Sequence, residues 1–83
     1  MHSVKLYTRK NCPLCEQAEL VIDMVQEDCL FQYEAIDIET SDDLTERFGL
    51  MIPVIEVDGE ILQYGQVDYV TLSEKLSGKT LND

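Results

Sequence analysis

Hydrophobic and polar positions along the chain predict strands and helices in turn. An apolar and β-branched run over residues 4–8 stops at a polar triplet, residues 9–11, which predicts a first strand followed by a loop. From Pro13 to Cys29, apolar side chains recur at spacings of three and four while acidic ones occupy the other side, so an amphipathic helix is predicted. Proline suits its first turn, because its missing N–H would have no partner there.

The middle of the chain predicts a second strand and a short second helix. The strand covers residues 31–38, and its broken alternation near residues 35–36 indicates burial on both faces. Thr40 with Asp43 three residues later has the form of a capping box, and Gly49 suits the position just after a helix. The second helix is therefore expected between these signals.

The last third of the chain predicts a hairpin and a final helix. Two apolar runs flank Asp58-Gly59, a dipeptide that accepts the positive φ angles of a two-residue hairpin turn. An apolar stripe over residues 66–76 predicts the helix, which Gly78 is placed to end. The expected order is β-α-β-α-β-β-α, and we expect one domain over residues 1–83 because the chain is too short for a second core.

Charge and cysteine content narrow the classes of function. Seventeen acidic against six basic residues give a net charge of −11, which would repel a nucleic-acid backbone and an anionic lipid surface. No apolar stretch approaches the ~18 residues that span a bilayer, and Met1 to Tyr7 lacks the apolar core of a signal peptide. We expect a cytoplasmic monomer that binds neither nucleic acid nor membrane. Three cysteines in a reducing compartment indicate a catalytic or metal-binding role.

The candidate chemistry lies in the CPLC segment at residues 12–15, where the first strand gives way to the first helix. Free N–H groups and the positive end of the helix dipole stabilise a thiolate there, which predicts Cys12 as the nucleophile. Cys15, one turn further on, is expected to be more buried and to act as the resolving thiol. Arg9 and Lys10 place positive charge beside this turn, where they either favour the thiolate or keep the loop soluble.

Other roles for the cysteines must be weighed against this one. A zinc site needs four ligands, and beyond the pair the chain offers only Cys29 and His2, which form no second close pair, so we expect no metal. Cys29 continues the apolar stripe of the first helix, about four turns from Cys15. It is expected to be a buried hydrophobic residue, out of disulfide reach of the pair. His2 is expected to be a solvated terminal residue.

The chain resembles the glutaredoxin-like members of the thioredoxin superfamily, close to the small bacterial proteins that carry CPLC. The matching segments cover nearly the whole chain: Leu6-Tyr7-Thr8, Cys12-Pro13-Leu14-Cys15, Asp37, Ile52-Pro53-Val54, Asp58-Gly59, Gly65 and Asp68. The resemblance implies an α/β thioredoxin fold, with a central four-stranded mixed sheet and flanking helices. It also implies that the Ile52–Pro53 bond is cis, and that the Ile52 backbone pairs with a bound substrate like a β-strand beside the cysteines.

The family's glutathione site is matched in part. Arg9 fills the basic position three residues before the first cysteine, but the turn from Gly65 to Asp68 lacks one glycine and one acidic residue of the family pattern, and Leu14 replaces the usual aromatic residue. The resemblance implies no tightly bound cofactor, with glutathione as a candidate co-substrate. The substrate-binding residues it implies are Arg9, Pro13, Leu14, Ile52, Pro53, Gly65 and Asp68.

Two classes of function follow. The first is an enzyme, a thiol–disulfide oxidoreductase that acts on a disulfide-containing protein or a glutathione mixed disulfide and is recycled by a thiol reductant, glutathione or the thioredoxin system. The second is a binding module of the same fold that holds a partner or, with glutathione, an iron–sulfur cluster. Cys15 favours the enzyme, because single-thiol cluster-binding relatives generally lack a cysteine at that position.

Overall fold

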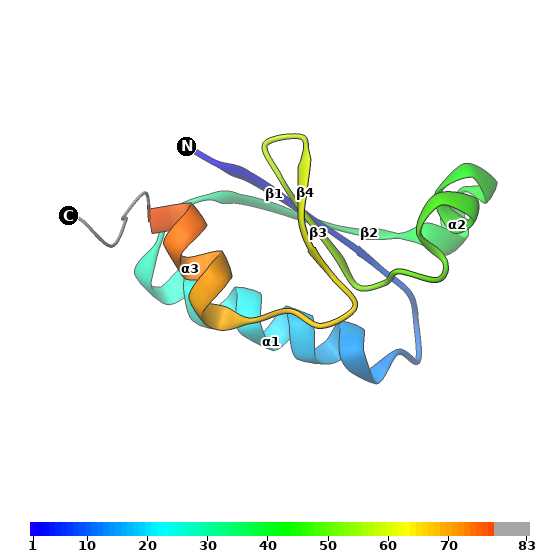
Figure 1. Ribbon diagram of the computed structural model, residues 1–83, viewed down its shortest axis with the longest axis horizontal. Coiled ribbons are helices and arrows are strands. Elements are labelled where there is room, and N and C mark those ends of the chain that lie inside the picture. The colour runs from blue at the N-terminus through cyan, green and yellow to red at the C-terminus, as the bar shows by residue number, and fades with distance from the viewer. Residues whose placement is uncertain (78–83) are drawn as a thin grey trace.

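The computed structural model describes residues 1–77 and shows an α/β fold (Figure 1). In chain order its elements are β1 (Ser3–Thr8), α1 (Pro13–Asp28), β2 (Gln32–Asp37), the 3-10 helix η1 (Ile38–Thr40), α2 (Asp42–Phe48), β3 (Val54–Val57), β4 (Glu60–Tyr64) and α3 (Tyr69–Ser77). Apart from η1, this order confirms the sequence prediction. No helix in the described part of the chain is both long and apolar enough to cross a membrane.

The four strands form one mixed sheet in the order β2-β1-β3-β4. β1 runs parallel to β2 and antiparallel to β3, and β3 and β4 form a hairpin. This arrangement confirms the expected mixed sheet of the thioredoxin fold. The prediction that the second strand is buried on both faces is wrong, because β2 lies at an edge, where Ala35 is exposed and Ile36 is half-buried.

Helices α1 and α3 lie together against one face of the sheet (Figure 1). The spacing that predicted α1 places Ala18, Ile22 and Val25 on its buried side. The larger core consists of Val4, Leu6, Ala18, Ile22, Val25, Phe31, Ile55, Val57, Leu72 and Leu76. Burial of a side chain such as valine or isoleucine contributes about 1.5–3 kcal/mol. This packing holds α1, and therefore its first turn, against β1.

The short helix α2 packs on the opposite face, near the end of β1. Successive strand residues point to opposite faces, so Leu6 enters the larger core while Tyr7 joins the smaller one with Phe48. The rings of Tyr7 and Phe48 lie 4.5 Å apart between centroids, and the Arg47 guanidinium lies 4.7 Å above Phe48. Burial and the neighbouring carboxylate of Glu56, which accepts the Tyr7 hydroxyl at 3.2 Å, raise the pKa of Tyr7.

The two ends of α2 differ from the sequence prediction. Ser41, not Thr40, caps the helix, since its hydroxyl accepts a first-turn amide at 3.2 Å. Thr40 belongs to η1 instead, where its hydroxyl donates to the Asp37 carbonyl at 2.7 Å. Gly49 has φ −55°, a right-handed conformation, and so does not form the left-handed helix end that was expected.

The hairpin turn has the predicted form and also holds the start of β1. Asp58 and Gly59 both have positive φ, 52° and 88°. The Asp58 carboxylate accepts the Ser3 amide at 2.9 Å and lies 2.5 Å from His2 Nδ1. These two hydrogen bonds, the one from Ser3 most of all, lower the pKa of Asp58. His2 is therefore half-exposed and paired, and not simply solvated as expected.

Candidate functional site

The two cysteines of the CPLC segment lie at the start of α1 and are joined as a disulfide, with Cα atoms 5.2 Å apart. Cys12 is the N-cap of α1, and Pro13 is the first helical residue, as predicted. The Cys15 N–H donates to the Cys12 sulfur at 3.2 Å. The first-turn amides of a helix have no partner within it, so they and the helix dipole favour negative charge on the Cys12 sulfur.

The two cysteines differ in exposure. Cys12 is partly accessible, whereas Cys15 is only 1% exposed and packed into the protein. Pro13 and Leu14, which lie between them, are exposed, with Leu14 at 44%. An incoming disulfide can therefore reach Cys12 across an apolar rim, while Cys15 approaches Cys12 from inside.

The sheet register brings the predicted substrate loop to the same end of the molecule as the cysteines. β1 and β3 are antiparallel with Tyr7 opposite Val54, so the loop before β3 lies beside the loop after β1. The Ile52–Pro53 bond in this loop is cis, which confirms what the resemblance implied. The Ile52 N–H donates to the Phe48 carbonyl at 3.0 Å, so strand-like pairing through that N–H would require this bond to open.

Gly65 ties the end of β4 to the same loop. Its N–H donates to the carbonyls of Met51, at 2.9 Å, and Pro53, at 2.8 Å. Gly65 has φ +78°, a conformation that glycine adopts readily and other residues rarely do. Its bonds therefore position the cis-proline loop, and its role in substrate binding stays a prediction.

Asp68 acts as the cap of α3, which begins at Tyr69, three residues later than predicted. Its carboxylate accepts the amides of Thr71 at 3.0 Å and Val70 at 3.3 Å, and also the Thr71 hydroxyl. The hydrogen bonds from Thr71, with that of its hydroxyl the largest, lower the pKa of Asp68. These contacts explain the position of Asp68 without a ligand.

Arg9 lies apart from Asp68 in its contacts. It is exposed and lines a hollow of about 220 Å³ together with Cys15 and Asp37, where β1, α1 and β2 meet. Within residues 1–77, Arg9 forms no ion pair or hydrogen bond with Asp68 or with the cis-proline loop. The structure therefore groups the predicted residues into two sets, one around the cysteines and one around Gly65.

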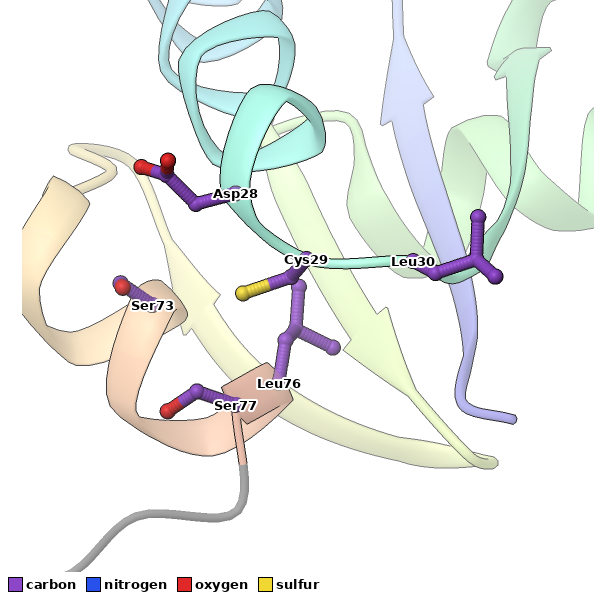
Figure 2. A pocket seen from close by; sticks show the side chains of 6 residues that line it. All are labelled: Asp28, Cys29, Leu30, Ser73, Leu76 and Ser77. Carbon is purple, nitrogen blue, oxygen red and sulfur yellow. The ribbon is translucent and has the colours of Figure 1, made fainter.

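A larger hollow, of about 640 Å³, lies at the far end of α1. Figure 2 shows the Cys29 sulfur pointing toward α3, between Ser73 and Leu76. Cys29 is the C-cap of α1 and half-buried, so it ends the apolar stripe less buried than expected. It lies fourteen residues after Cys15, about 20 Å along the helix at 1.5 Å per residue, so this hollow is separate from the cysteine pair.

The sequence was also compared with known protein families. A family model described as a glutaredoxin-like domain matches residues 3–77, which is most of the chain. The chain belongs to this glutaredoxin-like family. The match spans both cysteines, the cis proline and the Gly65 turn, so the family assignment covers every predicted site residue.

Solved structures similar to this glutaredoxin-like chain agree on the fold. A structural genomics target protein from X. campestris is 26% identical, with a TM-score of 0.74 over 93% of this chain and 99% of that one. A protein from Nitrosomonas europaea is 23% identical, with a TM-score of 0.78 over 90% and 91%. A mutant thioredoxin from Halobacterium salinarum is 20% identical, with a TM-score of 0.71 over 93% and 73%. These similarities confirm the thioredoxin fold.

One residue of the glutaredoxin-like site received no role from the sequence. Asp37 was noted only as part of the family resemblance, yet its carboxylate borders the hollow beside Cys15. The available signal was its position at the end of a strand expected to lie parallel to β1. Parallel strands end at the same edge of a sheet, so this carboxylate and the cysteine pair were bound to meet there.

Proposed function

We propose that this glutaredoxin-like protein is a thiol–disulfide oxidoreductase with Cys12 as nucleophile and Cys15 as resolving thiol. The observation that supports it most directly is the asymmetry of the pair. Cys12 is accessible and caps α1, where backbone amides favour a thiolate, while Cys15 lies buried at disulfide distance. A purely structural disulfide needs no such difference between its two sulfurs.

The reaction would run in two exchange steps. In the reduced protein, the Cys12 thiolate attacks one sulfur of a substrate disulfide, forms a mixed disulfide and releases the other substrate sulfur as a thiolate. Cys15 then attacks the Cys12 sulfur, the mixed disulfide breaks, and the second substrate sulfur leaves. The substrate gains two electrons and two protons, and the protein ends with the Cys12–Cys15 disulfide. A thiol reductant, glutathione or the thioredoxin system, would restore the dithiol.

We further propose that protein disulfides are the preferred substrates. Apolar side chains are exposed around the end of the molecule that carries the pair, among them Leu14, Leu50 and Tyr64. An apolar surface of this kind suits a polypeptide better than a charged tripeptide. Asp68, which the family pattern would use for glutathione, is already hydrogen-bonded within α3.

Thiol variants test the oxidoreductase activity. We expect the reduced wild-type protein to reduce a disulfide-containing protein such as insulin, and Cys29→Ser to match it as a control. Cys12→Ser should abolish exchange, and Cys15→Ser should accumulate a mixed disulfide on Cys12 that mass spectrometry detects. An active Cys12→Ser protein would overturn the proposal.

Substrate preference is tested by comparing turnover on insulin with turnover on a glutathionylated peptide. We expect the protein disulfide to be favoured, and Arg9→Ala to change neither rate more than the matched variant Lys10→Ala. A strong preference for the peptide that is lost only in Arg9→Ala would show instead that Arg9 binds glutathione through a charge-assisted contact.

A further inference from the structure

The hollow beside Cys15 contains a carboxylate to which no role has been assigned. The hollow has a volume of about 220 Å³, and both Cys15 and Asp37 line it. Thr8 and Asp37 are opposite each other in the parallel β1–β2 pair. Asp37 therefore stands at the end of the strand next to β1, the strand that leads into the cysteine pair.

Asp37 is held in place by the 3-10 turn that follows it. One carboxylate oxygen, Oδ1, accepts the Glu39 amide at 2.9 Å, and the Asp37 carbonyl accepts the Thr40 hydroxyl at 2.7 Å. Within residues 1–77 the other oxygen, Oδ2, accepts no hydrogen bond, and the carboxylate forms no ion pair. The side chain is half-buried. One oxygen thus fixes the carboxylate, and the other is left to accept a proton.

We propose that Asp37 accepts, through water in this hollow, the proton that Cys15 must lose in order to resolve the mixed disulfide. The inference rests on the proposed function. The Cys15 proton moves to the Asp37 carboxylate, and the electron pair on the Cys15 sulfur forms the bond to the Cys12 sulfur. The bond between Cys12 and the substrate sulfur breaks, and its electron pair leaves on that sulfur, which takes a proton from solvent. The substrate sulfur is reduced and the cysteine pair is oxidised.

The surroundings of Cys15 explain why a proton acceptor helps. The residue is 1% exposed, and burial in a protein opposes the charged thiolate. Transfer of its proton to Asp37 exchanges one negative charge for another, so the total charge around the hollow does not change. A water molecule takes up about 30 Å³ in the liquid, so the hollow has room for several that can relay the proton.

Four other charged residues line the hollow: Arg9 and Lys10 from the loop after β1, and Glu16 and Glu19 from α1. All four side chains are exposed, so water screens their effect on Cys15. Asp37 is the half-buried carboxylate among the described residues of this lining. Glu16→Gln and Glu19→Gln are therefore matched controls, since each removes one carboxylate from the same hollow.

The test follows the two exchange steps separately in a Cys29→Ser background. The reduced protein is mixed with a symmetric aromatic disulfide whose thiolate is coloured, so that the first equivalent of colour reports attack by Cys12 and the second reports resolution by Cys15. Asp37→Asn keeps an oxygen for the Glu39 amide and removes the charge. Asp37→Ser is a second variant that also keeps a capping oxygen.

We expect both Asp37 variants to release the first equivalent at the wild-type rate. The second should be released about 100-fold more slowly near pH 6.5, in line with the loss of a general base. The difference should disappear above the ordinary thiol pKa of about 8.5, where the thiolate forms without help. The two glutamine controls should behave like the wild type.

Three results would overturn the inference: an unchanged second phase, a faster one, or a slowing that is the same at every pH, which would mean a structural role for Asp37. Absence of the first phase in the parent protein would instead refute the oxidoreductase function itself. The two failures are therefore distinguishable in one experiment.

Discussion

Phe48 connects the smaller core to the loop that carries the cis proline. Its ring is buried and packs against Tyr7 at 4.5 Å. Its carbonyl accepts the amides of Met51 at 2.8 Å and Ile52 at 3.0 Å. The substitution Phe48→Leu removes the ring contact that holds this residue, so both amides should open to solvent more often than the rest of the molecule.

The expected loss of stability follows from the packing that the ring provides. An aromatic pair contributes about 0.5–1.5 kcal/mol beyond area burial, and a hydrophobic swap of similar volume usually costs less than about 1.5 kcal/mol. Together they predict that Phe48→Leu lowers the free energy of unfolding by about 1–3 kcal/mol. In a domain of this size each kcal/mol corresponds to about 4–8 °C in Tm. The variant should stay folded at room temperature, since small domains have about 5–15 kcal/mol of stability.

Hydrogen exchange of the native protein, followed by NMR, is the assay. The matched control is Ile22→Val in the larger core, a change that costs about 0.5–1.5 kcal/mol. After correction for global stability, Phe48→Leu should lower the protection of the Met51 and Ile52 amides, and Ile22→Val should not. Equal protection of these amides in the two variants would refute the connection between ring packing and the loop.

Three further predictions concern the thiols, alkaline pH and the start of β1. In the reduced protein, brief iodoacetamide treatment and mass spectrometry should find Cys12 alkylated before Cys29, and the reverse order would place the reactive thiol elsewhere. Burial and two nearby carboxylates raise the pKa of Tyr33 from 10 to about 12, so its contribution to stability is complete below pH 10 and is lost as the pH rises toward 12; Tyr33→Phe should flatten that part of the denaturation curve. The lowered pKa of Asp58 stabilises the fold above its ordinary value and this effect is lost in acid, so Asp58→Asn should lower Tm at pH 7 but hardly at pH 2.

The order of elements could be predicted because each leaves a periodic pattern in its own segment. Apolar spacing set α1, and Asp58-Gly59 set the hairpin. The ends of α2 could not be predicted, because two capping residues, Thr40 and Ser41, stand side by side. The choice between them depends on η1, which uses the Thr40 hydroxyl to close on Asp37.

The candidate site was predictable where its chemistry is local. The cysteine pair needs only the start of one helix, and its disulfide geometry is as expected. Contacts between distant segments left no such pattern: the Gly65 amide reaches Met51 and Pro53 because β3 and β4 are paired, and Asp37 reaches the hollow because β2 lies beside β1. The bond from Ile52 to Phe48 likewise depends on how α2 ends.

The two outer strands of the sheet leave one side of their backbones without a strand partner among the described residues. Unpaired edges of this kind allow sheets of separate molecules to join, and β4 also exposes Ile61 and Tyr64. Each molecule carries a net charge of −11, so two edges repel as they approach within the screening length of about 10 Å at 0.1 M salt. The same carboxylates that disfavour nucleic acids and lipids therefore protect the protein from aggregation, and this protection ends as the pH falls toward the isoelectric point of about 4.2.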